Sequence, residues 1–144
     1  MYGLLFNVRS LEPGHSYYVF RVNSRTGYYE LVKMEIRTDR IEPEYVIPSK
    51  FSSIITTGPN ILEVRQNWKK VELLINNEKI DEFTIAEEVD DFIQVGLHAH
   101  AYDGETHNVL FDDFHVTANG IGSQIQMMNM MMSGTISIKD VELK

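Results

Sequence analysis

Hydrophobic residues in this chain alternate with polar ones at a period of two, the spacing of a β-strand, and not at the 3.6-residue period of a helix. The stretch Ser16–Asn23 (SYYVFRVN) is dense in the aromatic and β-branched side chains that strands favour. In Trp68–Asn76 (WKKVELLIN), the apolar residues Val71, Leu73 and Ile75 share one face. Because no helical pattern of ten or more residues is found, the chain is predicted to be all-β.

The predicted strands are short and are separated by turn residues. They are Tyr2–Val8, Ser16–Asn23, Tyr28–Glu35, Ile61–Gln66, Trp68–Asn76, Ile80–Ile85, Phe92–His100, Asn108–Thr117 and Thr135–Leu143, with Ser53–Thr56 as a short further candidate. Polar turns at Asn23–Gly27 and Asn76–Lys79 predict hairpins. Thr38–Lys50 contains Pro43 and Pro48 among charged residues and is predicted to be a loop. Many short strands of this kind predict a sandwich or a barrel.

The C-terminal stretch has a different composition. Asn119–Ser123 is predicted to be a flexible joint, and Gln124–Met132 holds five of the seven methionines. Methionine fills irregular gaps and adaptable surfaces, so this segment is interpreted as a loop or short helix covering one end of the sandwich. A partner surface and a poorly ordered tail are the alternatives. The expected organisation is a core over residues 1–118, a Met-rich connecting loop over 119–133, and a final strand over 134–144 that completes the sandwich.

Composition narrows the function classes. The 144 residues carry 13 Lys and Arg against 21 Asp and Glu, a net charge of -8, which argues against nucleic acid and against an anionic membrane surface. The chain has no cysteine, which excludes disulfides, thiolate zinc sites and cysteine nucleophiles. Neither a membrane-spanning apolar run nor a signal peptide is expected. These features do not indicate in which cellular compartment the chain works.

Six short motifs occur in a characteristic order. They are Tyr2-Gly3, Tyr18–Val22, Asn60–Val64, Leu74–Asn77, Val95–Leu97 and Phe111–Phe114. In this order they resemble the concanavalin A-like lectin/glucanase superfamily, and more narrowly its laminin-G-like and sugar-hydrolase-associated domains, over roughly residues 2–117. The resemblance implies a jelly-roll β-sandwich of two antiparallel sheets, polysaccharide recognition on a concave sheet face, and an extracellular or cell-surface setting.

Two departures from that family pattern matter. Family domains usually have further strands before the Tyr-Gly strand. Either this chain is a C-terminal piece of a larger domain, or Thr135–Leu143 fills the gap; we favour the second interpretation, or an oligomer that pairs the edge. Asn77 stands where the family usually has Gly. Asn tolerates the left-handed backbone conformation that such a turn needs, so we expect it to serve there.

The acidic residues do not form a glucanase site. Such a site needs two carboxylates about 5–5.5 Å apart, carried in this fold by a Glu-x-Asp-x-x-Glu-like array, and none is present. The acids of the stretch 87–91 are interpreted as a solvated loop. Asp112 and Asp113 are neighbours on a predicted strand and are expected on opposite faces. The missing carboxylate pair argues against an enzyme and leaves the question open.

The predicted ligand-binding residues lie on strands. Gln94, His98 and His100 share one face of Phe92–His100. The full predicted set is Tyr18, Arg21, Tyr28, Gln94, His98 and His100. Tyr17 and Tyr29 are equal candidates as stacking rings, because the strand register decides which tyrosine of each adjacent pair faces inward. Trp68 is interpreted as a packing residue or as a sugar-stacking one.

A metal site is a weaker interpretation. His98 and His100 are spaced as a metal pair would be, although two histidines lining a polar face is the simpler explanation. The loop residues Asp103, Glu105 and His107 supply ligands that calcium or another divalent cation accepts, although a simple turn explains them too. No cofactor is certain, and calcium is the candidate ion.

The leading hypothesis is a non-catalytic, lectin-like module that binds carbohydrate. Two alternatives stay open. One is a glycoside hydrolase-like enzyme that uses a concave cluster of histidines and acids. The other is a structural or assembly domain in which a sheet edge pairs with a partner strand or a second copy.

Overall fold

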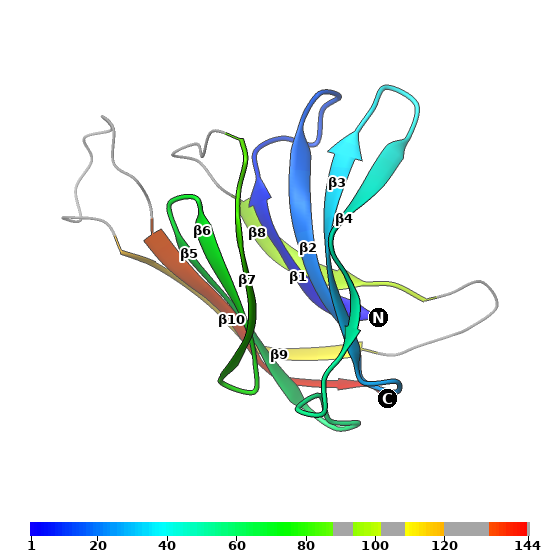
Figure 1. The fold of residues 1–144 in the computed structure, drawn as a ribbon, viewed down its shortest axis with the longest axis vertical. Helices are drawn as coiled ribbons and strands as arrows, with labels where there is room; N and C mark the ends of the chain where they lie inside the picture. Colours follow the sequence, from blue (N-terminus) through cyan, green and yellow to red (C-terminus); the bar gives the residue numbers. More distant parts are fainter. Residues whose placement is uncertain (88–93, 102–108, 120–132, 144) are drawn as a thin grey trace.

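The computed structural model describes residues 1–87, 94–101, 109–119 and 133–143 (Figure 1). They form strands and no helix, which confirms the all-β prediction. The strands are β1 (Tyr2–Val8), β2 (Ser16–Asn23), β3 (Tyr28–Ile36), β4 (Ile41–Phe51), β5 (Asn60–Asn67), β6 (Lys70–Ile75), β7 (Glu78–Thr84), β8 (Gln94–Ala99), β9 (Val109–Asn119) and β10 (Ser133–Leu143).

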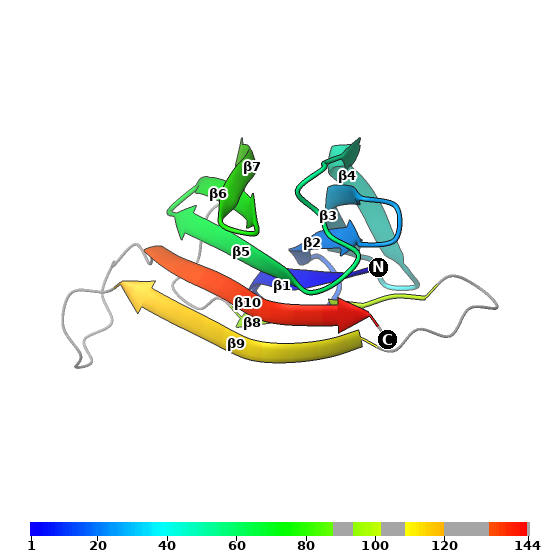
Figure 2. The same cartoon turned by 90° about the horizontal axis from the view of Figure 1, so that it is seen from below.

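The strands form two antiparallel sheets in a sandwich-like arrangement that is not closed into a barrel. Sheet A has the order β4-β3-β2-β1-β8, and sheet B has the order β7-β6-β5-β10-β9. Figure 2 shows β5, β10 and β9 side by side, with β9 at the edge. The edge strands are therefore β4 and β8 in sheet A, and β7 and β9 in sheet B.

Apolar side chains from both sheets make one core. The inner face of each sheet is the one directed at the other sheet. Sheet A contributes Tyr2, Leu4, Phe6, Tyr18, Phe20, Val22 and Leu31, and sheet B contributes Leu62, Val64, Val71, Leu73 and Ile75. The alternation seen in the sequence supplies these residues, since every second side chain of a strand lies on the same face.

The hairpin between β6 and β7 is as tight as its two asparagines predict. Asn76 and Asn77 have φ values of 51° and 68°. Positive φ at both central residues is the pattern of the two-residue turn that matches strand twist. Asn77 thus adopts the left-handed conformation expected of it in place of Gly. The Asn76 amide also fixes its surroundings, because Nδ2 donates to Ile54 O at 2.7 Å and Oδ1 accepts from Ile61 N at 2.8 Å.

Two secondary-structure predictions were wrong. The segment predicted as a loop over Thr38–Lys50 contains all of β4 except its last residue, and the predicted strand Ser53–Thr56 is a turn and coil. β4 is an edge strand of sheet A, so Pro43 and Pro48 need not donate hydrogen bonds to a further strand. Proline and charge protect an edge strand, and in the sequence alone they resemble the residues of a loop.

β10 lies inside sheet B, between β5 and β9, and does not pair with β1. β1 instead lies between β2 and β8. The final strand therefore completes the second sheet and leaves β8 as an edge of the first. The Met-rich segment of 119–133 falls almost wholly outside the described residues, so its predicted role stays a prediction.

A buried asparagine ties the two sheets together. Asn60 has no exposed surface, and its Nδ2 donates to the Tyr2 hydroxyl at 3.0 Å and to Thr56 O at 2.8 Å. Its Oδ1 accepts from Thr56 N at 2.8 Å. Because Tyr2 is on β1 and Asn60 starts β5, this polar cluster joins sheet A to sheet B at the point where the chain crosses between them. Buried polar groups are retained where all of them find partners.

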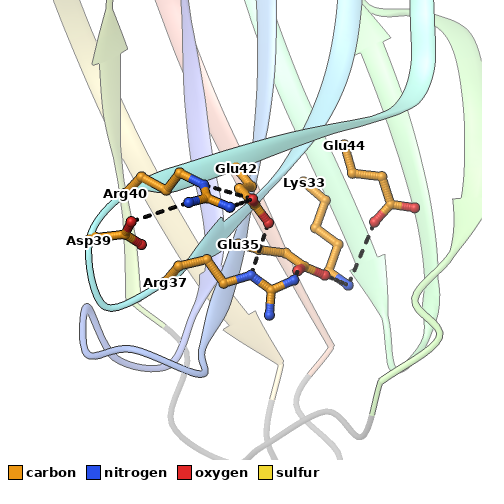
Figure 3. Close-up of polar contacts among 7 residues, drawn as sticks. All are labelled: Lys33, Glu35, Arg37, Asp39, Arg40, Glu42 and Glu44. Atoms are coloured by element: carbon orange, nitrogen blue, oxygen red, sulfur yellow. Dashed lines mark hydrogen bonds and ion pairs between the residues drawn. The ribbon is translucent and has the colours of Figure 1, made fainter.

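Alternating charges line the β3–β4 hairpin, as Figure 3 shows. Glu35 and Glu42 each contact Arg37, with Arg37 Nε 3.0 Å from Glu42, and Arg40 Nη2 lies 2.6 Å from Glu42. Lys33 contacts Glu35 at 3.3 Å, and it also contacts Glu87. These pairs are mostly exposed, so they add little stability. Their main effect is to surround this edge of sheet A with charge.

Candidate functional site

The register of β2 against β3 decides which tyrosines are available to a ligand. Tyr18 pairs with Lys33, and Val22 pairs with Tyr29. Tyr18 and Tyr29 are buried on the inner face, so Tyr17 and Tyr28 are on the outer face of sheet A. The register thus decides which tyrosine of each adjacent pair faces inward, which the sequence alone does not.

Tyr18, one of the six predicted ligand-binding residues, belongs to the core. Its ring stacks on Phe6 with centroids 5.5 Å apart, and its side chain is 3% exposed. Its hydroxyl donates to Glu87 Oε2 at 2.9 Å, and burial, followed by that carboxylate, raises the pKa of Tyr18. Tyr18 therefore does not join the other predicted residues on the outer face.

Four residues form a row across the outer face of sheet A, from β8 to β3. His98 pairs with Gly3, Gly3 with Arg21, and Arg21 with Glu30. We call this set, His98, Gly3, Arg21 and Glu30, the outer row. It brings together two of the predicted ligand-binding residues, and no described strand of sheet B lies on this side of the sheet.

Arg21 and Glu30 hold each other in place. Arg21 Nε donates to Glu30 Oε1 at 2.6 Å, and Nη2 of the same guanidinium is 2.6 Å from that oxygen. The side chains are 12% and 7% exposed. A charged pair this far from solvent keeps its geometry, because separating the partners would leave an uncompensated charge. Glu30 was not among the predicted site residues; its position opposite Arg21 in the hairpin register was the available signal.

Gly3 occupies a position that only glycine fits. A Cβ built on Gly3 would lie 1.9 Å from Phe20 O and 2.6 Å from Arg21 Cα. The backbones of β1 and β2 thus approach more closely here than any side chain permits. Because Gly3 projects nothing from the sheet, no side chain separates His98 from Arg21 across the outer row.

His98 is neutral and partly buried. Its Nε2 is buried, and no hydrogen-bond partner for it is found in the described part of the chain. Burial, followed by the positive charges of Arg21 and His100, lowers the pKa of His98 to about 4. At neutral pH the ring therefore keeps a nitrogen able to accept or donate one hydrogen bond, depending on the tautomer.

Next to the outer row lie His100 and an exposed aromatic pair. The His98 and His100 rings are stacked, with centroids 6.3 Å apart and planes at 13°. Tyr28 is 42% exposed and meets Phe51 edge to face at 5.8 Å. Tyr28 and Glu30 are two residues apart on β3, so they share the outer face. Gln94 is exposed at the opposite end of β8 from His100.

Asp103, Glu105 and His107 lie outside the described residues, so the calcium prediction stays a prediction. Among the residues that the structure does describe, no group of three His, Asp or Glu side chains is placed to hold a metal ion.

The paired aspartates of β9 do not alternate as a regular strand would. Asp113 has a φ of 49°, and the pairing of β9 with β10 shifts register beside it. The Asp113 backbone N–H donates to Asp112 Oδ1 at 2.9 Å. The two residues therefore form a β-bulge, and the expectation of opposite faces, which assumed a regular strand, does not apply.

Trp68 lies in the turn between β5 and β6, and not at the start of a strand as predicted. It has a φ of 52°, its side chain is 43% exposed, and Lys69 Nζ is 5.7 Å from its ring centroid. It is carried by sheet B, so it is not part of the outer row.

The described residues include no helix long and apolar enough to cross a membrane. Comparison of this chain with protein-family models, with curated proteins and with solved structures finds no match.

Proposed function

We propose that this chain is a non-catalytic carbohydrate-binding module with a jelly-roll sandwich fold, and that the outer face of sheet A binds the sugar. The observation that carries this proposal is the outer row, where Arg21, Glu30 and His98 lie in line on the outer face of sheet A beside an exposed Tyr28. The order of family-like motifs in the sequence supports the same function.

The chemistry of the outer face suits neutral sugars. Sugar hydroxyls need hydrogen-bonding groups held in place, and Arg21 and Glu30 are held by each other. The neutral His98 ring adds a polar nitrogen without a charge. The exposed Tyr28 ring offers an apolar face for stacking on a sugar ring. With a net charge of -8, the whole chain favours uncharged over acidic glycans.

The same geometry favours binding over hydrolysis. A retaining glycosidase needs two carboxylates about 5–5.5 Å apart. The outer row contains one carboxylate, Glu30, and both of the close contacts to its Oε1 come from Arg21. The outer row by itself therefore supplies one of the two carboxylates that such a hydrolysis needs.

The test is a glycan array probed with the purified chain and with two matched variants. Tyr28→Ala removes an aromatic ring that is 42% exposed on the outer face, and Trp68→Ala removes one that is 43% exposed on sheet B. We expect the Tyr28→Ala chain to lose at least tenfold in binding and the Trp68→Ala chain to bind as the parent does. A His98→Ala, His100→Ala double variant should also lose binding.

Circular dichroism of each variant establishes that the fold is intact. If the folded parent chain binds no glycan on the array, the proposal is wrong. Loss of binding in Trp68→Ala with retention in Tyr28→Ala would move the site to sheet B. Binding that disappears only when EDTA is added would place the site at an ion, and the loop containing Asp103, Glu105 and His107 would become the first candidate.

A further inference from the structure

The two sheets have four edge strands, and these are unequally protected against pairing with another strand. β4 carries Pro43, Pro48 and the charges of Glu42, Glu44 and Lys50, and β7 carries Glu78, Lys79, Asp81 and Glu82. Proline and charge are the devices by which natural sheets block their edges. Both protected edges lie at the same end of the sandwich, since Lys50 of β4 contacts Asp81 of β7 at 2.6 Å.

The other two edges lack these devices. β8 (QVGLHA) has no proline and no Asp, Glu, Lys or Arg. β9 carries its two aspartates at the bulge, and beyond the bulge the stretch 114–119 (FHVTAN) has neither proline nor a carboxylate, Lys or Arg. Within the described residues no strand pairs with the outer edge of either one.

Large apolar side chains are exposed beside these edges. Leu97 on β8 and Phe114 on β9 are each 38% exposed, and Val116 is 50% exposed. Across β10 the register aligns Val116 with Val64 and Phe114 with Leu62, both of which are fully buried. Val116 and Phe114 therefore continue the inner, apolar face of sheet B up to an edge where it stops.

We propose that a second copy of this chain pairs with the edge of β9, antiparallel and over the stretch 114–118. An unpaired edge recognises an extended strand through its free N–H and C=O groups. β9 is itself such a strand, and a two-fold axis lets each copy satisfy the edge of the other at once. The six residues beyond the bulge are as long as a typical strand. Sheet B would then run continuously from five strands to ten.

The charges of β9 restrict the register. A pairing centred on the bulge would place Asp112 and Asp113 of one copy opposite the same residues of the other, and like charges directly opposite each other are destabilising. A centre at Val116 avoids that arrangement, because it pairs the stretch 114–118 of one copy with the same stretch of the other. It also places the exposed Phe114 and Val116 of both copies next to one another on one face.

The first experiment measures the mass of the chain in solution by light scattering. We expect the parent chain to have twice its 16.6 kDa mass. Val116→Lys puts a charge into the proposed interface and should give a monomer. Ile41→Lys is the matched control, because Ile41 is 53% exposed on the protected edge strand β4. That variant should remain a dimer.

A second experiment does not depend on how Val116→Lys folds. Because the chain contains no cysteine, single cysteines report contact without interference. Phe114→Cys, His115→Cys and Val116→Cys place thiols along the proposed centre, and Tyr45→Cys places one on β4 as the control. Residues opposite each other across strands have Cβ atoms about 4.5–5.5 Å apart, close to disulfide distance. We expect mild oxidation to cross-link at least one of the three and not the control.

These measurements can overturn the pairing directly. A parent chain that stays monomeric up to about 100 µM, far above the range of stable dimers, rules out the second copy, and the edge would then serve a strand of a different chain. A dimer that cross-links through Tyr45→Cys, or that Ile41→Lys breaks and Val116→Lys does not, would place the interface on β4. Neither result bears on the glycan array, since the outer row belongs to sheet A.

Discussion

His98 shows how much the chemistry of one residue depends on its neighbours across the sheet. Gly3 leaves the space beside it without a side chain, and Arg21 stands on the far side of that space. Burial and the nearby positive charges lower the pKa of His98 to about 4, from an ordinary value near 6.5. The ring is therefore neutral in the folded chain over a range in which the unfolded chain is protonated.

This difference predicts a pH dependence of stability. Between pH 6.5 and about 4 the unfolded state binds more protons at His98 than the folded state does, so the free energy of unfolding falls as the pH falls through that range. Above pH 6.5 the contribution is fully present. Denaturant unfolding of the parent and of His98→Gln at pH 7.5, 6.5 and 5.0 measures it.

We expect His98→Gln to lose less stability than the parent between pH 6.5 and 5.0. His15→Gln removes a different imidazole and serves as the control. In NMR spectra the His98 ring resonances should not titrate above pH 5. A midpoint near 6.5 would show that the ring is solvated and that the outer row is more open than described.

The adjacent tyrosines show that a sequence alone does not decide which of two neighbouring side chains faces the core. Tyr17 and Tyr18 are chemically identical neighbours, and a shift of one residue in strand register exchanges their faces. The pairing of Tyr18 with Lys33 settles the matter in favour of a buried Tyr18. The histidine pair was easier, because a spacing of two on a strand puts both rings on one face in any register.

The pairing of β1 with β2 depends on the glycine at position 3. Gly3 lies where β1 and β2 approach too closely for a Cβ, with Phe20 O only 1.9 Å from where that atom would be. Backbone atoms cannot move aside as the end of a flexible side chain can. A substitution here must therefore separate β1 from β2, which also disturbs the pairing of β1 with β8.

We predict that Gly3→Ala lowers the free energy of unfolding by at least about 3 kcal/mol, at or beyond the upper end of overpacking effects. Gly58→Ala is the matched control, because the nearest atom to its added Cβ is 4.0 Å away and its φ is not positive. That change should alter stability by no more than about 1 kcal/mol. Urea unfolding of both variants is the measurement, and equal stabilities would contradict the close approach.

Strand prediction succeeded where side chains alternate and failed where an edge is protected. The range of β2 was predicted to the residue, since Ser16–Asn23 carries strand-forming residues bounded by turns. β4 was missed, because its prolines and charges resemble those of a loop. A single sequence does not show that a neighbouring strand, here β3, is present to hold such a segment extended.

On the scale of the whole molecule, aromatic contacts hold the two sheets together at the protected end. Phe83 of β7 packs against two rings of sheet A, with centroids 5.2 Å from Tyr18 and 6.3 Å from Phe6. Tyr29 and Lys50 of sheet A both contact Asp81 of β7. β7 thus links the sheets through apolar contacts and through charge.

Phe83→Ala should destabilise the chain by about 2–3 kcal/mol, somewhat less than the loss of a fully buried phenylalanine, because Phe83 is only partly buried. Phe51→Ala removes the same ring from a position that is 64% exposed. We expect that control to cost less than about 1 kcal/mol. Thermal unfolding compares them, and the opposite order would mean that β7 does not join the sheets as described.

The two-sheet architecture follows from the sequence pattern, whereas the order of strands in each sheet does not. Alternation at β6 and β10 predicts strands, but nothing local states that β10 lies between β5 and β9. Pairings between strands far apart in the chain depend on the packing of the whole core. For the same reason, the sequence predicts two residues of the outer row, Arg21 and His98, as ligand-binding residues. It does not predict that they lie in one row, because that depends on how β8, β1, β2 and β3 pair.

The unequal edges also set a limit on growth. If β9 joins two copies across a two-fold axis, each new edge of the extended sheet B is a β7, whose charges reject a further strand. Addition to sheet B therefore stops after one step, so this sheet does not grow into an open fibre. A sheet with two unprotected edges would add copies without limit, whereas sheet B has one unprotected edge, β9, and one edge protected by charge, β7.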